Sequence, residues 1–178
     1  MINNIHKIYN QITNLLIEKG ITVTTMESCT SGLISSLITD AEGASAIFKG
    51  AYVVYSNDAK IMNGVNACVI DKYGVYSEET AIAMALACKD KYKSDIGIGI
   101  TGTFGNVDPS NNDSVPGEVY YSIVMYDEVF SAKIQLMSSN GRLESIFESF
   151  MSSNGRFESK LEVASVVGQK LLRIIQGS

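Results

Sequence analysis

The 178-residue sequence predicts an α/β fold: a three-layer α/β/α sandwich around a mixed, mainly parallel sheet, with an antiparallel hairpin at one side. Two observations favour it. Short β-branched segments alternate with helical segments through the first hundred residues, and parallel strands need such crossovers. Later, two strand-like segments are separated only by Tyr126-Asp127-Glu128, which is too short for a crossover and indicates a hairpin. One domain, residues 1–178, accounts for the chain, because its length suits a single core.

Periodicity and end signals predict the elements of the first half. Apolar residues recur at helical spacing over residues 2–17, and Gly20 follows as a helix stop. Residues 21–26 are β-branched and form a short strand, and residues 33–38 start a second helix after a tight turn. Residues 51–55 form the next strand, and the Ser-Asn-Asp that follows is typical of a helix N-cap.

Capping residues and residue patterns also predict the elements of the second half of the chain. Ser77 caps a helix over residues 78–92. Isoleucines alternate with glycines over residues 96–100, which indicates a buried strand closely packed by a neighbour. The remaining predicted elements are a loop over 102–116, strands over 119–125 and 129–137, and a final helix running to about residue 175.

Composition excludes several classes of protein. A net charge of −5 offers no general attraction for nucleic acid. No apolar run approaches the ~20 residues needed to span a bilayer, and the polar N-terminus does not resemble a signal peptide. Three cysteines without a CxxC pair indicate a reducing compartment. We therefore expect a cytoplasmic protein without membrane or nucleic-acid partners, and a symmetric homodimer is the default assembly.

The single histidine excludes further chemistry. His6 lies in the polar N-terminal helix, where we expect it on the surface. Ser-His-Asp and Cys-His activation both require a histidine beside the nucleophile, so neither is expected. Zinc sites of ordinary spacing are also excluded, and no metal or cofactor is expected. Residues 97–102 match G-x-G-x-x-G, but a loop rather than a helix follows, so we expect no dinucleotide site there.

The chain contains one internal repeat. The segment Met-Ser-Ser-Asn-Gly-Arg of residues 137–142 recurs at residues 151–156. One duplication over 137–156 with a spacing of 14 residues does not make a solenoid, and we interpret it as a tandem insertion before the last helix.

A hydrolase without histidine can still activate serine with an unprotonated lysine. Ser28, Tyr55 and Thr101 all fall at predicted strand ends, where open α/β sheets bind ligands, and Lys60 starts the next helix. The N–H groups of residues 29–32 could cradle a phosphate or an oxyanion. The residues also have structural interpretations: Ser28 as a cap, Tyr55 as a core aromatic and Lys60 as a solvated charge.

Five segments, in order and at matching spacing, resemble the CinA C-terminal domain family of nicotinamide-nucleotide amidases. The family patterns are T-x-A-E-S-C-T-G-G, G-x-V-x-Y-S-N-x-x-K, H-G-A-V-S-E, [ST]-G-x-A-G-P and P-x-G-x-V. The corresponding segments here are residues 22–32, 50–60, 73–78, 99–105 and 115–119. The match is to the free-standing form of the amidase.

The resemblance implies hydrolysis of the carboxamide of nicotinamide mononucleotide to nicotinic acid mononucleotide and ammonia, without metal or cofactor. It implies Ser28 as nucleophile, Lys60 as proton acceptor and Tyr55 as the residue that orients them. The residues that it implies for substrate binding are Cys29, Thr30, Ser31, Gly32, Thr101, Gly102, Gly105 and Arg156.

Three departures from the family patterns bear on activity. Ser31 replaces the first of two paired glycines, and would be strained if the turn needs a positive φ. Phe104 and Asn106 replace a small residue and a proline in the second loop. Either Arg142 or Arg156 could match a family arginine. The alternatives are therefore a catalytically silent nucleotide-binding domain and a competence- or damage-associated interaction domain.

Overall fold

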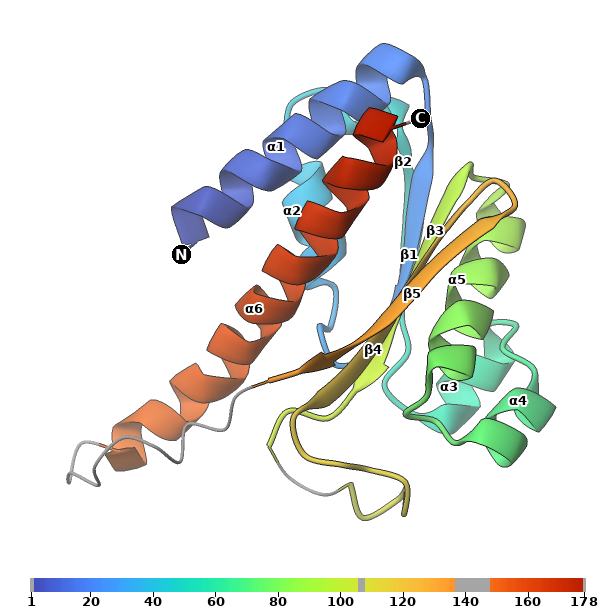
Figure 1. Cartoon of the computed structure of the whole chain (residues 1–178), viewed down its shortest axis with the longest axis vertical. Coiled ribbons are helices and arrows are strands. Elements are labelled where there is room, and N and C mark those ends of the chain that lie inside the picture. The colour runs from blue at the N-terminus through green and yellow to red at the C-terminus, as the bar shows by residue number, and fades with distance from the viewer. Residues whose placement is uncertain (1, 106–107, 137–147, 178) are drawn as a thin grey trace.

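The computed structural model describes residues 2–105, 108–136 and 148–177. A five-stranded sheet with the strand order β2-β1-β3-β4-β5 runs through its centre, with helices on either side (Figure 1). In chain order the elements are α1 (Ile2–Lys19), β1 (Val23–Glu27), α2 (Leu33–Thr39), a 3-10 turn (Ala44–Ala46), β2 (Phe48–Val53), α3 (Asn57–Met62), α4 (Ala67–Tyr73), α5 (Glu78–Tyr92), β3 (Ile96–Gly102), β4 (Glu118–Met125), β5 (Glu128–Gln135) and α6 (Glu148–Gly177).

The sheet is mixed. Strand β1 pairs in parallel with both β2 and β3, whereas β4 pairs antiparallel with both β3 and β5. The hairpin of β4 and β5 turns at Tyr126 and Asp127, as the sequence predicts. The three-layer α/β/α architecture is confirmed, but the sheet is parallel only over β2-β1-β3, so its pairings divide evenly between the two kinds.

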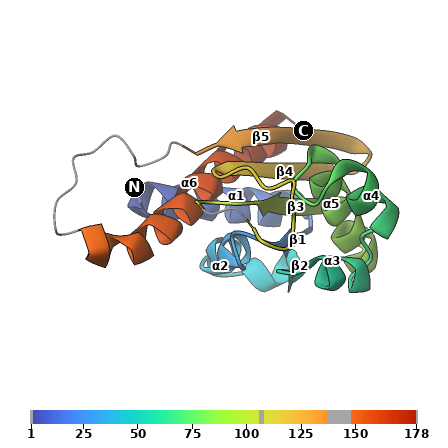
Figure 2. The same cartoon turned by 90° about the horizontal axis from the view of Figure 1, so that it is seen from below.

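The helices form one layer on each face of the sheet. Helices α1, α2 and α6 cover one face, and α3, α4 and α5 lie on the other (Figure 2). The larger core cluster fills the first side and includes Tyr9, Ile98 and Val167, all fully buried. A smaller cluster around Met26 and Met84 fills the second side. Among the described residues no helix is long and apolar enough to cross a membrane.

Two elements of the fold differ from the sequence-based prediction. Strand β2 begins at Phe48 and ends at Val53, earlier at both ends than predicted. The N–H of Val54 donates to the carbonyl oxygen of Glu27 at 2.8 Å, a parallel ladder bond that continues the pairing with β1. The short helix α4 was not predicted at all. None of its residues is buried, so it has no apolar stripe by which periodicity could reveal it.

The alternating glycines of β3 are explained by close contact with α5. A Cβ atom added at Gly97 would lie 2.2 Å from the carbonyl oxygen of Ala85, and one at Gly99 would lie 2.1 Å from that of Ala81. This confirms the prediction of a closely packed buried strand. Because all three glycines of the G-x-G-x-x-G match lie inside β3, no helix opens there to bind a dinucleotide.

The duplicated segment is only partly described. The second copy, residues 151–156, belongs to α6, whereas residues 137–147, which include the whole first copy, lie outside the described residues.

Candidate functional site

Ser28 lies at the carboxyl end of the central parallel strand. It directly follows β1, and its N–H donates to the carbonyl oxygen of Ile100 in β3 at 3.0 Å. The chain then enters α2 on one face of the sheet, whereas the neighbouring strand β2 continues into α3 on the other face. Such a switch point between adjacent parallel strands opens a crevice in which α/β proteins bind their ligands.

The buried carboxylate of Glu27 holds the turn after β1. It accepts the hydroxyl of Thr30 at 2.7 Å and the N–H groups of Gly32 at 2.9 Å, Ile34 at 3.2 Å and Ser35 at 2.9 Å. These are the N–H groups that begin α2, so the carboxylate of Glu27 occupies the place of an external anion. Of the N–H groups of residues 29–32 expected to form an anion cradle, that of Gly32 is therefore taken by Glu27.

The backbone of this turn is left-handed at two successive residues. The φ angle is +53° at Ser31 and +89° at Gly32. Ser31 thus adopts the positive φ that glycine would accommodate more easily. Its N–H donates to the carbonyl oxygen of Ser28 at 3.1 Å, which closes the turn around the candidate nucleophile.

Lys60 reaches Ser28 from the opposite side of the crevice. It lies in α3, which starts where the hydroxyl of Ser56 accepts the N–H of Ala59 at 3.1 Å. Its side chain is only 2% exposed. Its Nζ donates to the Oγ of Ser28 and to the carbonyl oxygen of Val54, both at 3.3 Å.

Burial sets the protonation of this lysine. It lowers the pKa of Lys60 to about 8, against weaker opposing effects of Cys29 and Asp108. No salt bridge to Lys60 occurs among the described residues. About one-tenth of the Lys60 side chains are therefore neutral at pH 7, ready to accept a proton. Burial also raises the pKa of the Cys29 thiol to about 12, so this neighbour of Ser28 stays a protonated thiol.

Tyr55 forms its hydrogen bond with Arg156 rather than with the Ser28–Lys60 pair. Its side chain is 64% exposed, and its hydroxyl accepts a hydrogen bond from a guanidinium nitrogen of Arg156 at 3.2 Å. Arg156 also lies over the ring of Phe104, 5.6 Å from the ring centroid. Among the described residues no hydrogen bond joins Tyr55 to Ser28 or Lys60, so the orienting role that the resemblance implies is not seen in this arrangement.

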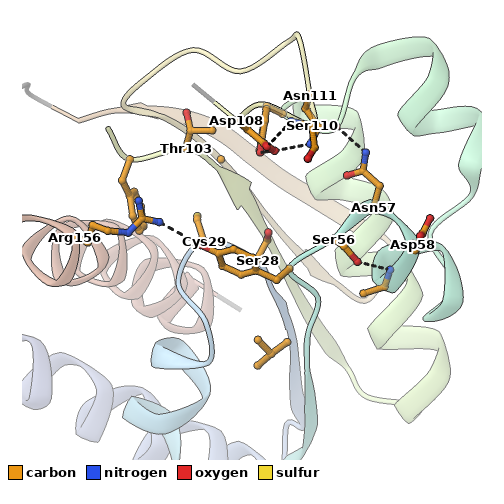
Figure 3. Close-up of a pocket in the computed structure, with 16 residues that line it drawn as sticks. Ser28, Cys29, Ser56, Asn57, Asp58, Thr103, Asp108, Ser110, Asn111 and Arg156 are labelled. Atoms are coloured by element: carbon orange, nitrogen blue, oxygen red, sulfur yellow. Dashed lines mark hydrogen bonds between the residues drawn. The ribbon is translucent and has the colours of Figure 1, made fainter. Parts of the chain in front are cut away.

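A cavity of about 900 Å³ opens above Ser28 (Figure 3). The candidates that line it are Ser28, Cys29, Tyr55, Gly102 and Arg156. The candidates that do not line it are Thr30, Ser31, Gly32, Lys60, Thr101 and Gly105, and Lys60 meets the cavity only through its contact with Ser28.

Two of the candidates outside the cavity have clear structural roles. Thr101 is buried, and its hydroxyl donates to the carbonyl oxygen of Val75 at 2.9 Å. Thr30 is also buried, bonded to Glu27. Both side chains hold the walls together behind the cavity rather than facing into it.

Several cavity residues were not singled out from the sequence. Asn57, Asp108, Ser110 and Asn111 line the wall opposite α6 (Figure 3), and Tyr76 also lines the cavity. For Asp108, Ser110 and Asn111 the available signal was the density of Asp, Asn and Ser in the loop that follows β3, and Asn57 and Tyr76 lie within the family-like segments 50–60 and 73–78. Which of these polar residues face the cavity depends on how the loop folds.

His6 takes no part in this site. Its Nδ1 lies 3.4 Å from a carboxylate oxygen of Asp40 at the end of α2. Within the described part of the chain, no three His, Cys, Asp or Glu side chains gather in a way that could hold a metal ion.

The fold and the site define a class: an α/β/α protein with a buried serine–lysine pair at the carboxyl ends of its parallel strands. The family follows from comparison of sequences. The family model described as the CinA C-terminal domain matches residues 5–152, and the chain belongs to this family.

Known proteins agree with this assignment. The chain is 38% identical over 135 residues to a protein of Halothermothrix orenii provisionally named competence-damage inducible, covering 75% of this chain and 32% of the relative. It is 36% identical over 135 residues to a CinA-like protein of Kosmotoga olearia, with the same coverage of 75% and 32%. The chain thus spans about a third of the length of these curated relatives.

A solved structure shares the fold over nearly the whole chain. It is that of the competence/damage inducible protein CihA from Agrobacterium tumefaciens, with a TM-score of 0.79 and 25% sequence identity, covering 95% of this chain and 94% of that chain.

Proposed function

We propose that the protein hydrolyses the carboxamide of nicotinamide mononucleotide to nicotinic acid mononucleotide and ammonia. The observation that carries the proposal is the buried Lys60, which has its Nζ 3.3 Å from the Oγ of Ser28 and no salt bridge among the described residues. The choice of substrate rests on the five segments that resemble the amidase family. Membership of that family supports it.

The proposed reaction uses one serine and one lysine. Neutral Lys60 accepts the hydroxyl proton as the Oγ of Ser28 attacks the carboxamide carbon, and a tetrahedral intermediate forms. The Lys60 ammonium then gives that proton to the leaving nitrogen, so that ammonia departs and an acyl ester of Ser28 remains. A water molecule then attacks the ester and gives a proton to Lys60. As the carbon–oxygen bond breaks, the Lys60 ammonium returns this proton to the Oγ of Ser28, so that the carboxylic acid departs and both residues are restored.

The cavity suits a nucleotide of this kind. Its volume of about 900 Å³ lies within the range of small-molecule sites. Arg156 offers a guanidinium at one wall, and guanidinium groups bind phosphate through paired hydrogen bonds. We assign it to the substrate phosphate, with Tyr55 as the acceptor that holds the guanidinium in the free protein.

Ammonia release from nicotinamide mononucleotide tests the proposal. The purified protein, in the presence of a chelator, should release ammonia, and Ser28→Ala should lose at least about a thousandfold in kcat. Ser36→Ala is the matched control, because Ser36 is an exposed serine of the adjacent helix α2 and should keep full activity. Unchanged turnover in Ser28→Ala would refute the assignment of the nucleophile.

A second candidate is a nucleotide-binding domain without catalysis. Phe104, which stands where the family has a small residue, lines the cavity, and Arg156 lies over its ring. In addition, Tyr55 contacts Arg156 rather than the serine–lysine pair. Binding of nicotinamide mononucleotide without ammonia release would favour this candidate, including a role in the competence or damage responses for which relatives are named.

A further inference from the structure

Asp108 presents a firmly held carboxylate to the cavity. One of its oxygens accepts the hydroxyl of Tyr76 at 2.5 Å and the side-chain amide of Asn111 at 2.6 Å. The other oxygen accepts the N–H of Ser110 at 2.9 Å. Asn111 is fixed in turn by the amide of Asn57 at 2.7 Å. A carboxylate accepts about four hydrogen bonds, so these three leave capacity for a ligand.

This carboxylate is an anion that lacks a cationic partner among the described residues. The hydrogen bond from Tyr76, with those from Asn111 and Ser110, holds the pKa of Asp108 below its usual value. No salt bridge to Asp108 occurs in the described part of the chain. The Lys60 ammonium favours the ionised carboxylate, although the two side chains form no salt bridge.

The cavity therefore carries opposite charges on different walls. Arg156 enters from α6 on one side, and Asp108 enters from the loop after β3 on another, with Ser28 between these elements (Figure 3). A ligand that bears both an anionic and a cationic group complements this arrangement. Charges of opposite sign on two walls favour such a ligand over one that lacks either charge.

We propose that Asp108 is a specificity-determining residue that selects carboxamides carried on a cationic ring, that is, quaternary pyridinium carboxamides, over their uncharged counterparts. The inference rests on the proposed function, because the carboxamide must reach Ser28. In a nicotinamide nucleotide the positively charged ring nitrogen is separated from the carbon bearing the carboxamide by one ring atom. The ring charge therefore enters the cavity close to Lys60, where it is repelled, and Asp108 supplies the attraction that offsets this repulsion.

Equilibrium binding to the Ser28→Ala protein tests this selection without turnover. The two probes are nicotinamide mononucleotide and its 1,4-dihydro form, which share the phosphate, ribose and carboxamide but differ in ring charge. We expect the oxidised form to bind about five- to tenfold more tightly. Adding Asp108→Asn should weaken binding of the oxidised form by about that factor and leave the reduced form unchanged.

Two further variants separate charge from structure. Asp108→Glu keeps the charge and should keep the preference. Asp113→Asn is the matched control: Asp113 lies in the same loop and accepts the N–H of Tyr76 at 3.0 Å, but it does not line the cavity, so both affinities should stay unchanged. Circular dichroism confirms that each variant is folded.

Several results would overturn the inference. Equal weakening of both probes by Asp108→Asn would mean that Asp108 recognises a part they share, such as the ribose. An unchanged preference in Asp108→Asn, or failure of the Ser28→Ala protein to bind either probe, would also reject it. An Asp108-dependent preference in a protein that releases no ammonia would sustain the inference and refute the amidase. Ammonia release without such a preference would sustain the amidase proposal and reject the role of Asp108.

Discussion

At the scale of single residues, the site depends on a lysine held without a carboxylate partner. A lysine that forms a salt bridge keeps its proton, because the ion pair favours the charged form. Lys60 instead contacts a hydroxyl and a carbonyl oxygen, both neutral. Burial then makes its neutral form accessible near physiological pH, and this is the property that a general base needs.

The pH dependence of turnover follows from this pKa. Because only neutral Lys60 can accept the proton of Ser28, kcat/KM should rise about tenfold per pH unit at low pH and reach half its maximum near pH 8. Steady-state ammonia release gives the profile when it is measured from about pH 6 to about pH 10, a range that brackets this pKa. Activity that is flat across the range would contradict Lys60 as the base.

Lys60→Met should abolish turnover and yet stabilise the fold. The pKa of Lys60 is about 8 in the folded protein and near its ordinary value of 10.5 when unfolded, so the unfolded chain binds more protons between these values. Wild-type stability therefore rises with pH across that window, and the full cost of the buried charge is present below pH 8. The free energy of unfolding of Lys60→Met should exceed that of wild type by about 1–3 kcal/mol at pH 7.

Urea denaturation at several pH values measures this difference, which should shrink as the pH rises toward 10.5. Lys49→Met is the matched control. Lys49 is an exposed lysine of β2, so its replacement should give no comparable gain. A destabilised Lys60→Met at neutral pH would show that the two hydrogen bonds of Lys60 outweigh its burial.

At the scale of elements, the contact between β3 and α5 sets how the cavity walls approach each other. The glycines of β3 face the small side chains of α5, so the helix backbone lies directly on the strand. The strand ends at Gly102, which lines the cavity, and the loop with Asp108 follows. A shift of β3 relative to α5 would therefore move one wall of the site.

Gly99→Ala tests the tightness of this contact. The added Cβ would meet the carbonyl oxygen of Ala81 at 2.1 Å, so the helix must move away. We expect the free energy of unfolding to fall by about 2–3 kcal/mol, measured by thermal or urea denaturation. Gly105→Ala, where nothing lies within 4 Å of the added atom, should change stability by less than about 1 kcal/mol. Equal effects of the two substitutions would contradict the close packing.

At the scale of the whole molecule, the cavity joins segments that are far apart in the chain. The hydrogen bond between Arg156 and Tyr55 spans 101 residues and links α6 on one face of the sheet to the segment after β2. Ser28 directly follows strand β1, Lys60 belongs to helix α3 and Arg156 belongs to helix α6. The three residues therefore come from the sheet and from both helical layers. The site therefore exists only when both helical layers are packed on the sheet.

The duplicated segment offers a test of this assembly. Arg156→Ala should raise KM for nicotinamide mononucleotide about tenfold or more, because its guanidinium is assigned to the phosphate, and should change kcat little. Nicotinamide riboside, which lacks the phosphate, should be affected much less. Arg142→Ala, in the other copy, is the comparison variant. A larger effect of Arg142→Ala would transfer the phosphate role to the first copy.

Much of the architecture could be predicted from local sequence signals. The helix predicted over 78–92 coincides with α5, because its Ser77 cap and continuous run of helix-forming residues lie in adjacent positions. The alternating glycines of residues 96–100 indicated the tight packing later seen between β3 and α5. Helix α4 also has a capping residue, Asn66, but none of its residues is buried, so no apolar stripe marks it in the sequence.

The sequence by itself also determined the chemical inventory: one histidine, a serine after the first strand and a lysine at the start of the helix after the second strand. Only the tertiary structure decided how these groups are used. In the folded chain, N–H groups at the start of α2 donate to Glu27, Tyr55 accepts a hydrogen bond from Arg156, and Asp108 lines the cavity. The physical reason is that caps and periodicity act between neighbours in the chain. Burial, pKa and access to a cavity instead depend on groups that meet only when the layers pack.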